Sequence, residues 1–391
     1  MKILFLNPRL PFPLISGDRV KSYFLLKHLG SHHEVTLVAY YQGKNVPEEY
    51  VKEVEKLGVR VYVLPLSPVL SGINAAAHLL SMPLEVAYYT GRKFREKVDE
   101  LLDQENFDLA ISFFLRSSEY LKKKNIPKVL IAEDCRILYQ QRSFQNSRSF
   151  MQKAVRLWEY LHLKIYEPKI VNTFDITTCV TNTDIENMRQ RSPDAKFKLL
   201  TNGVDLNYYT PNEDFSRRNG ILFTGKLDVY SNTMMANEII NDIFPKISEK
   251  HPSTVLTIAG AKAPKSLLLQ NSDKIHIFSD LPDLLPYYQN ARIFLHPHHG
   301  ASGIQNKILE AMACGCCVVG TATGSQGIPA EHRKNIMIAN SNKEMIEYAL
   351  LLLEDDKLAT EISENARKSM VEHHSWEAIF KQLDEVIRSL A

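Results

Sequence analysis

The sequence lacks the features of a secreted or membrane-spanning chain. Its first apolar run, residues 3–6, is too short for the core of a signal peptide, and a proline follows at position 8. The most apolar long stretch, residues 62–80, is interrupted by two prolines, a glycine and a histidine, so it is not predicted to span a bilayer. We therefore expect a cytoplasmic protein.

Cysteine is scarce, and its count is odd. There are five cysteines, which without a secretory signal argues against a disulfide framework. Three of them cluster at Cys314, Cys316 and Cys317, near several histidines. Their spacing is unlike that of the common zinc pairs, and residues 316–319 have the composition of a buried strand. We therefore expect no metal site.

Several catalytic motifs are also missing. The sequence contains no G-x-x-x-x-G-K-[ST] phosphate loop, no G-x-G-x-x-G turn and no correctly spaced G-x-S-x-G elbow. It also lacks the D-x-D pair with which one large class of sugar transferases holds a metal. These absences disfavour kinases, simple dehydrogenases and serine hydrolases.

What the sequence does contain is an alternation of β-rich runs and helical stretches. Runs such as residues 2–6, 35–40 and 109–113 alternate with helical apolar spacing, and the pattern restarts at residue 220. A polar, loop-like segment at 202–219 separates the two series. This order predicts an α/β protein with two parallel, doubly wound sheets.

The two halves differ in charge although the whole chain is nearly neutral, with a formal net charge of +2. Residues 1–200 carry 29 Lys and Arg against 22 Asp and Glu, a net +7. The remaining residues carry 18 and 23, a net −5. Two bodies with different ligands would explain this asymmetry, and so would ordinary variation of a solvated surface.

The most informative segment runs from residue 299 to 315. Ser302 followed by Gln305 predicts a capping-box helix start, and Gly315 suits the C-terminal cap. The amides of 303–305, the helix dipole and Lys307 would attract a phosphate. Glu310, three residues after Lys307, could accept hydrogen bonds from a ribose diol. An ordinary capped helix with a Lys–Glu pair is the alternative.

Residues 310–315, E-A-M-A-C-G, resemble the donor-site helix of glycosyltransferase family 4, also called group 1. These are retaining nucleotide-sugar transferases of the GT-B fold, in which two Rossmann-like domains face each other across a cleft. Residues 303–310, G-I-Q-N-K-I-L-E, are most similar to a bacterial subgroup associated with exopolysaccharide systems. Residues 316–319, C-C-V-V, follow this motif where the family has x-P-V-V.

The resemblance extends over nearly the whole chain. Residues 202–205, N-G-V-D, are similar to the family's interdomain motif, and 223–227 to its phosphate-binding F-x-G-R-L. Residues 278–284 resemble the segment that contacts the base, and 13–19 the glycine loop that faces the donor. Residues 375–377 resemble the start of the last helix, which in the family crosses back to the first domain. The implied domains are 1–202 on the acceptor side, 203–374 for the donor, and 375–391 for the crossing helix.

The resemblance also has departures. Ser302 stands where the family's E-x7-E pair has its first acid, which puts the donor sugar in doubt. Ser231 stands near the family's second basic residue, whose charge Lys307 could replace. The histidine found after an N-terminal-domain strand is missing, and Glu133 and Asp134 offer carboxylates instead. These acids could orient the acceptor hydroxyl or take its proton, or simply cap the following segment.

The resemblance implies the following site residues. Catalytic roles are expected for Glu133, Asp134, Lys226 and Lys307. Donor binding is expected for Gly17, Gly225, Lys226, Leu281, His299, Ser302, Gly303, Ile304, Gln305, Lys307 and Glu310. Arg19 and Arg116 are expected on the acceptor side, and the neighbouring His296 and His298 are weaker candidates for the sugar.

The implied function is transfer of a sugar from a nucleotide-diphosphate sugar to a glycan or a lipid-linked acceptor in surface or exopolysaccharide synthesis. The reaction would retain the anomeric configuration and need neither a metal nor a cofactor. A sugar-nucleotide epimerase and a non-catalytic GT-B nucleotide-binding subunit remain alternatives. Basic and aromatic residues within 142–169 suggest peripheral contact with the inner face of an anionic membrane or with a lipid-diphosphate acceptor, or else a solvated helix face. No motif points to nucleic acid.

Overall fold

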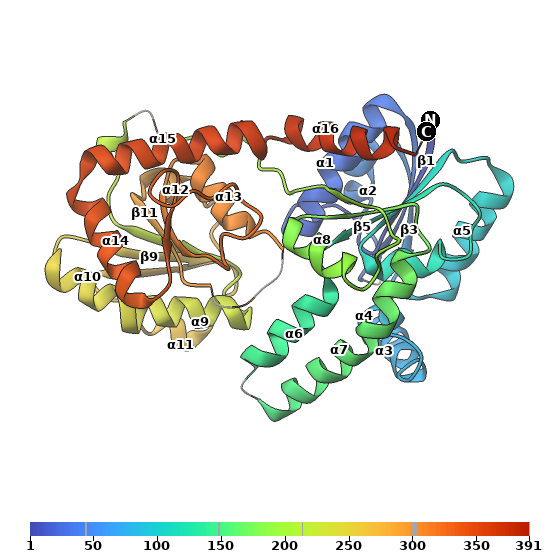
Figure 1. Cartoon of the computed structure of the whole chain (residues 1–391), viewed down its shortest axis with the longest axis horizontal. Coiled ribbons are helices and arrows are strands. Elements are labelled where there is room, and N and C mark those ends of the chain that lie inside the picture. Colours follow the sequence, from blue (N-terminus) through green and yellow to red (C-terminus); the bar gives the residue numbers. More distant parts are fainter. Residues whose placement is uncertain (44, 148, 213, 299, 301–302, 391) are drawn as a thin grey trace. The chain divides into compact units, whose positions relative to one another are not determined.

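The computed structural model describes residues 1–390 except 44, 148, 213, 299 and 301–302. It divides into two compact units (Figure 1). The first unit comprises Met1–Thr201 and Phe380–Ala391, and the second comprises Asn202–Ile379. The last helix, α16 (Trp376–Arg388), therefore begins in the second unit and ends in the first. Both chain ends lie in the first unit.

The first unit is built on a seven-stranded sheet in the order β3-β2-β1-β4-β5-β6-β7. All its strand pairs are parallel. The strands are β1 (Lys2–Asn7), β2 (Glu34–Tyr41), β3 (Val59–Pro65), β4 (Leu109–Phe113), β5 (Lys128–Glu133), β6 (Ile176–Cys179) and β7 (Phe197–Leu199). The order reverses between β1 and β4, which in such sheets is where ligands bind beyond the carboxyl ends of the strands.

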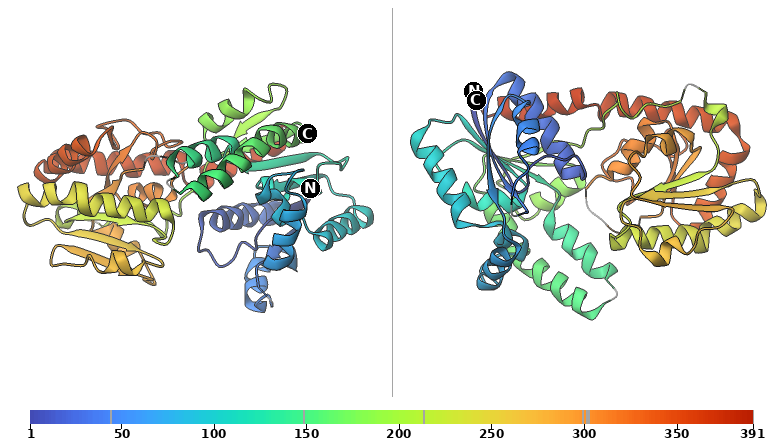
Figure 2. Two further views of the ribbon diagram at one scale, coloured as in Figure 1. Left: turned by 90° about the horizontal axis from the view of Figure 1, so that it is seen from below. Right: turned by 180° about the vertical axis from the view of Figure 1, so that it is seen from behind.

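Helices connect these strands and flank the sheet (Figures 1 and 2). They are α1 (Gly17–His32), α2 (Glu48–Glu55), α3 (Pro68–Ala77), α4 (Leu84–Tyr89), α5 (Arg92–Gln104), the 3₁₀ turn η1 (Leu115–Tyr120), α6 (Arg136–Asn146), α7 (Phe150–Val171) and α8 (Asn182–Arg189). In Figure 1 α3, α4, α6 and α7 extend from the lower side of this unit, and the view from behind in Figure 2 agrees.

The second unit repeats this plan with six parallel strands in the order β10-β9-β8-β11-β12-β13. Its strands are β8 (Ile221–Thr224), β9 (Leu256–Gly260), β10 (Ile275–Ser279), β11 (Ile293–His296), β12 (Cys317–Thr321) and β13 (Met337–Ala339). The switch point lies between β8 and β11. The carboxyl ends of these two strands carry the loops of the predicted donor site.

The helices of the second unit complete its layers. They are the 3₁₀ turn η2 (Phe215–Arg217), α9 (Tyr230–Glu238), the π segment η3 (Ile239–Ile243), α10 (Phe244–Lys250), α11 (Lys265–Leu268), α12 (Leu285–Asn290), α13 (Asn306–Ala313), α14 (Asn342–Glu354) and α15 (Asp356–His373). The segments α9, η3 and α10 follow one another directly. The helix expected over 232–249 is therefore one helical stretch that widens in its middle.

The central strands are buried along almost their whole length because helices cover both faces of each sheet. Every residue of β4 and β5 is buried, and so are the residues of β1 from Ile3 onward. One apolar cluster fills the first unit and another fills the second. The predicted α/β class with two doubly wound parallel sheets is confirmed.

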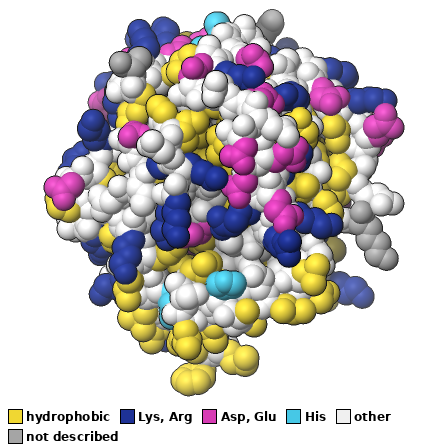
Figure 3. All heavy atoms as spheres, turned by 90° about the vertical axis from the view of Figure 1, so that its right-hand side faces the viewer, with side chains coloured by type: hydrophobic (Ala, Val, Ile, Leu, Met, Phe, Trp, Pro, Cys, Tyr) yellow, Lys and Arg dark blue, Asp and Glu magenta, His cyan; other side chains and the backbone are white. Residues whose placement is uncertain are grey.

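Part of the surface is unusually apolar. Figure 3, viewed toward the first unit, shows apolar side chains gathered at its lower end, where Figure 1 places α3, α4 and α7. Within the described residues, no helix combines the length and apolar character needed to cross a membrane.

Candidate functional site

Two glycines shape the carboxyl ends of β8 and β9. A Cβ on Gly260 would lie 1.7 Å from the carbonyl oxygen of Gly225, so the two backbones approach too closely for any side chain. A Cβ on Gly225 would lie 3.2 Å from the Nζ atom of Lys307 and 3.1 Å from the side chain of Asn232. Gly225 therefore lets a lysine from α13 reach the loop after β8.

Lys307 is the central cation of this site. Its Nζ donates to Oδ1 of Asn232 at 2.6 Å and lies 5.4 Å from the ring centre of Phe223. Burial lowers the pKa of Lys307 from 10.5 to about 8, although the charge of Glu310 opposes this effect. An anion at this position would favour the charged lysine. Asn232 was not predicted, although it directly follows Ser231, where the family pattern has its second basic residue.

Lys226 lies in the same loop as Gly225 but is much more exposed. Its ammonium group lies 3.7 Å from a carboxylate oxygen of Asp228, and 56% of its side chain is accessible. The Asn232 side chain donates to its carbonyl oxygen at 2.9 Å. Asn232 therefore holds together the two lysines that sequence analysis assigned to the diphosphate.

The helix that carries Lys307 starts later than expected. α13 begins at Asn306 with Gln305 as its N-cap, and the Gln305 side chain makes no capping hydrogen bond. The capping-box prediction from Ser302 is therefore wrong, because the chain stays non-helical through Gln305. Gly303 adopts a positive φ of 76°, and Ile304 is buried. The first amides of α13 have no partner within the helix and point out of its N-terminal end.

The C-terminal end of α13 is capped by Gly315, as predicted. Gly315 has a φ of 74°, its N–H donates to Met312, and the N–H of Cys316 donates to Ala311. This is a Schellman ending, which only a residue that tolerates a positive φ completes without strain. His299 and Ser302 lie outside the described residues.

Glu310 is held by tyrosines. Tyr288 donates its hydroxyl to Oε2 of Glu310 at 2.8 Å and shares a second hydrogen bond of 2.6 Å with Thr224. Tyr209 makes a further hydrogen bond to the same carboxylate. Burial raises the pKa of Glu310, and these hydrogen bonds and the Lys307 charge act against that rise. The tyrosines, which sequence analysis missed, fix the orientation of this acid.

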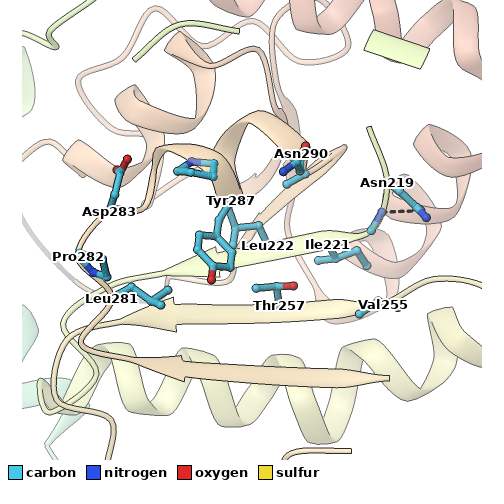
Figure 4. A pocket seen from close by; sticks show the side chains of 13 residues that line it. Asn219, Ile221, Leu222, Val255, Thr257, Leu281, Pro282, Asp283, Tyr287 and Asn290 are labelled. Carbon is cyan, nitrogen blue, oxygen red and sulfur yellow. Dashed lines mark hydrogen bonds between the residues drawn. The ribbon is translucent and has the colours of Figure 1, made fainter. Parts of the chain in front are cut away.

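Leu281, the expected base contact, lies beside a pocket of about 510 Å³ on the face of β8 and β9 (Figure 4). Tyr287 of α12 points toward Leu281 and Thr257 across this pocket. Its lining residues are Asn219, Gly220, Ile221, Leu222, Val255, Thr257, Leu281, Pro282, Asp283, Pro286, Tyr287, Asn290 and Ala291. Of the residues predicted to bind the donor, Leu281 lines this pocket, whereas Lys226, Lys307 and Glu310 do not.

The histidines near this site are buried. His296, at the end of β11, is fully enclosed and neither ring nitrogen has a hydrogen-bond partner among the described residues. Burial, and secondarily the charge of Lys307, hold its pKa well below the usual value. His298 is also buried. Neither ring is exposed for direct contact with a sugar in this conformation.

The first unit places a buried ion pair at the carboxyl end of β5. Glu133 has a φ of 70°, a conformation that costs a residue with a side chain about 1 kcal/mol or more. Its carboxylate lies 2.7 Å from Nζ of Lys21, which also donates to the Leu200 carbonyl at 2.8 Å. Burial raises the pKa of Glu133, the lysine lowers it, and Asp134 and Asp18 raise it further. Lys21 was not predicted because nothing in its helical context marks it.

Glu85 contacts two arginines of the first unit, Arg136 and Arg116. Arg136 donates to both its carboxylate oxygens, at 2.7 and 2.9 Å, and reaches Asp134 at 3.3 Å. Arg116, expected on the acceptor side, lies 3.5 Å from Glu85. Asp134 and Arg116 are thus linked through Arg136 and Glu85, which sequence analysis missed.

The glycine loop of the first unit precedes α1. Gly17 is the first residue of α1, after the N-cap Ser16. Arg19 donates to the Pro13 carbonyl at 3.4 Å, a contact with the loop that precedes α1. Arg9 pairs with Asp18 at 3.1 Å.

Comparisons with known proteins agree with this architecture. Residues 218–356 match the family model of glycosyl transferases group 1. An uncharacterised 44.6 kDa protein from the cps region of Klebsiella pneumoniae is 23% identical, over 98% of each chain.

Two solved structures show the likeness in three dimensions. Sucrose-phosphate synthase from Thermosynechococcus elongatus has 16% identity and a TM-score of 0.75, covering 100% of this chain and 99% of its own. Anabaena HepE in complex with UDP-glucose has 16% identity and a TM-score of 0.67, covering 100% of both chains. This chain therefore has the GT-B fold, and residues 218–356 of its second unit are similar to the group 1 glycosyl transferases.

Proposed function

We propose that the protein transfers a sugar from a nucleoside-diphosphate sugar to a glycan or lipid-linked acceptor in the synthesis of a surface polysaccharide. The observation that carries the proposal is the arrangement of Lys307, Asn232 and Glu310 beside Gly225. A buried lysine can bind a diphosphate, and a carboxylate held by tyrosines can bind a ribose diol. The match to glycosyl transferases group 1 over residues 218–356 supports it.

The diphosphate leaves with negative charge during transfer, and the second unit offers groups that stabilise this charge. Lys307 supplies a full charge when protonated, and the first amides of α13 supply partial positive charge from the helix end. Lys226 adds a second, more exposed cation from the loop after β8. We propose that these groups act without a metal and that the donor configuration is retained. Preorganised electrostatic stabilisation of this kind is a major source of catalysis.

The acceptor side is proposed from the first unit. Glu133 has a raised pKa and a strained backbone, and Asp134 lies next to it. We assign to this pair the orientation of an acceptor hydroxyl and the removal of its proton. Arg116 would then interact with an anionic group of the acceptor through the part of its guanidinium that Glu85 does not use.

The base of the donor is proposed to be uracil. HepE is described in complex with UDP, UDP-glucose and UDP plus glucose. A thermal-shift screen with UDP, GDP and dTDP and their glucose conjugates tests this, because a ligand of the native state raises the melting temperature. A shift with UDP compounds is expected, and no shift with any nucleotide would refute the donor site.

Glu310→Gln tests the role of the carboxylate. The amide still accepts the tyrosine hydrogen bonds but loses the charge that holds two ribose hydroxyls, so UDP affinity should fall about tenfold or more. Glu347→Gln, an exposed acid on α14, is the matched control. Unchanged affinity in Glu310→Gln would contradict the assignment. The protein could also bind UDP but release none from UDP-sugars when polyprenyl-diphosphate-linked sugars are offered as acceptors. That result would favour a non-catalytic subunit.

A further inference from the structure

Two helices of the first unit expose large apolar side chains. On α7, Phe150, Leu157, Leu161 and Ile165 are all exposed, and their spacing places them on one side of the helix. The opposite side of α7 faces the core. On and after α3 the exposed apolar side chains are Val69, Leu70, Ile73, Leu79 and Leu80. We call these residues together the α3–α7 surface.

The charged side chains exposed on α3 and α7 have one sign. Residues 61–84, which include α3, contain no Asp, Glu, Lys or Arg. Both acids of α7, Glu159 and Glu167, are buried. The exposed charged side chains of α7 are Lys153, Lys164 and Lys169. Figure 3 shows Lys and Arg side chains bordering the apolar area.

Both helices are hydrogen-bonded to α4. The carboxylate of Glu159 accepts from the backbone amides of Leu84 and Glu85 at 2.9 and 3.0 Å, so α7 caps the start of α4. Asn74 of α3 donates to the carbonyl oxygens of Ala87 and Thr90 at the end of α4. The α4 helix therefore fixes α3 and α7 together.

We propose that the α3–α7 surface docks on an anionic lipid bilayer. Apolar side chains would enter the interface between headgroups and acyl chains, and the lysines would meet the lipid phosphates. Large apolar side chains that are exposed together often mark a site of docking on a membrane or on another protein. Two copies of this chain meeting through it would bring like charges together, which disfavours self-association. The inference concerns where the protein works and does not depend on the transfer reaction.

The test is flotation of the full-length protein with vesicles of phosphatidylcholine, with and without phosphatidylglycerol. We expect flotation with the anionic vesicles that weakens as salt is raised. Leu70→Ser/Ile73→Ser and Phe150→Ser/Leu161→Ser should each lower partitioning about tenfold or more, because they remove side chains that would be buried in the lipid. Lys153→Gln/Lys164→Gln should lower it roughly tenfold on anionic vesicles only.

Leu269→Ser is the matched control, because Leu269 is 85% exposed but lies in the second unit. All variants should unfold at the wild-type temperature, since the changed side chains are exposed. Absence of vesicle binding by the wild type, or binding that the α3–α7 variants leave intact, would overturn the proposal. A concentration-dependent dimer abolished by the same variants would overturn it in favour of a self-interface. UDP binding, measured separately, reports on the transferase proposal alone.

Discussion

Lys307 should make donor binding depend on pH in a way that can be worked out from its surroundings. Its pKa falls from 10.5 to about 8 because the side chain is buried between Phe223 and Asn232. Keeping the charge in the empty site therefore costs roughly 3 kcal/mol, at about 1.4 kcal/mol per pKa unit. A bound diphosphate compensates the charge and returns the pKa toward its normal value. Binding thus takes up a proton above pH 8.

The direction and size of the pH effect on UDP affinity follow from this proton uptake. Below pH 8 the lysine is already charged and affinity is at its full value. Above pH 8 the empty protein loses the proton that the complex needs, so affinity falls by nearly tenfold per pH unit. UDP should bind about tenfold more weakly at pH 9 than at pH 7.

Isothermal titration calorimetry at pH 7, 8 and 9, in buffers of different ionisation enthalpy, measures both the affinity and the proton uptake. Lys307→Met should bind weakly at every pH, with no slope above pH 8. Because the variant removes a buried charge, its empty form should be at least as stable as the wild type. Lys226→Met keeps Lys307 and should keep the slope. An affinity that does not change from pH 7 to 9, or an equal slope in Lys307→Met, would refute the reasoning.

Two further substitutions test the packing and the acceptor-side ion pair. Gly203→Ala would place a Cβ 2.7 Å from the indole of Trp376 and should lose roughly 1–3 kcal/mol in urea unfolding. Gly72→Ala meets nothing within 4 Å and should be neutral or stabilising, so equal losses in the two variants would contradict the packing argument. Lys21→Met leaves the buried carboxylate of Glu133 unpaired and should lose about 3 kcal/mol at pH 8. The loss should be smaller at pH 5 than at pH 8, because the raised pKa of Glu133 favours its neutral form as the pH falls. Adding Glu133→Gln should restore stability; a loss that is the same at both pH values would exclude the pair as its cause.

Much of the fold could be predicted because its signals are local. The buried strands of parallel sheets are continuous apolar runs, and β1, β4 and β8 are visible in the sequence as such. Gly315 ends its helix where the sequence predicts, because a positive φ there requires glycine. By contrast, α3 and α4 were not predicted. Their segment has no polar face to give a helical period, since its exposed side is apolar as well.

The start of α13 shows where local patterns fail. Ser302 and Gln305 have the spacing of a capping box, but the chain becomes helical only at Asn306. Gly303 adopts a positive φ of 76°, which a right-handed helix does not contain, so the helix does not begin there. The sequence could not reveal this, because the glycines at 300 and 303 permit several backbone paths.

The sequence by itself determined the two-sheet architecture and the end of α13, the helix that carries Lys307 and Glu310. Only the tertiary structure decided which partners these side chains meet. Asn232 reaches Lys307 across 75 positions, and Lys21 reaches Glu133 across 112. The physical reason is that parallel strands bring loops that are distant in the sequence to one edge of a sheet. Sequence patterns, by contrast, reflect interactions between residues that are close together along the chain.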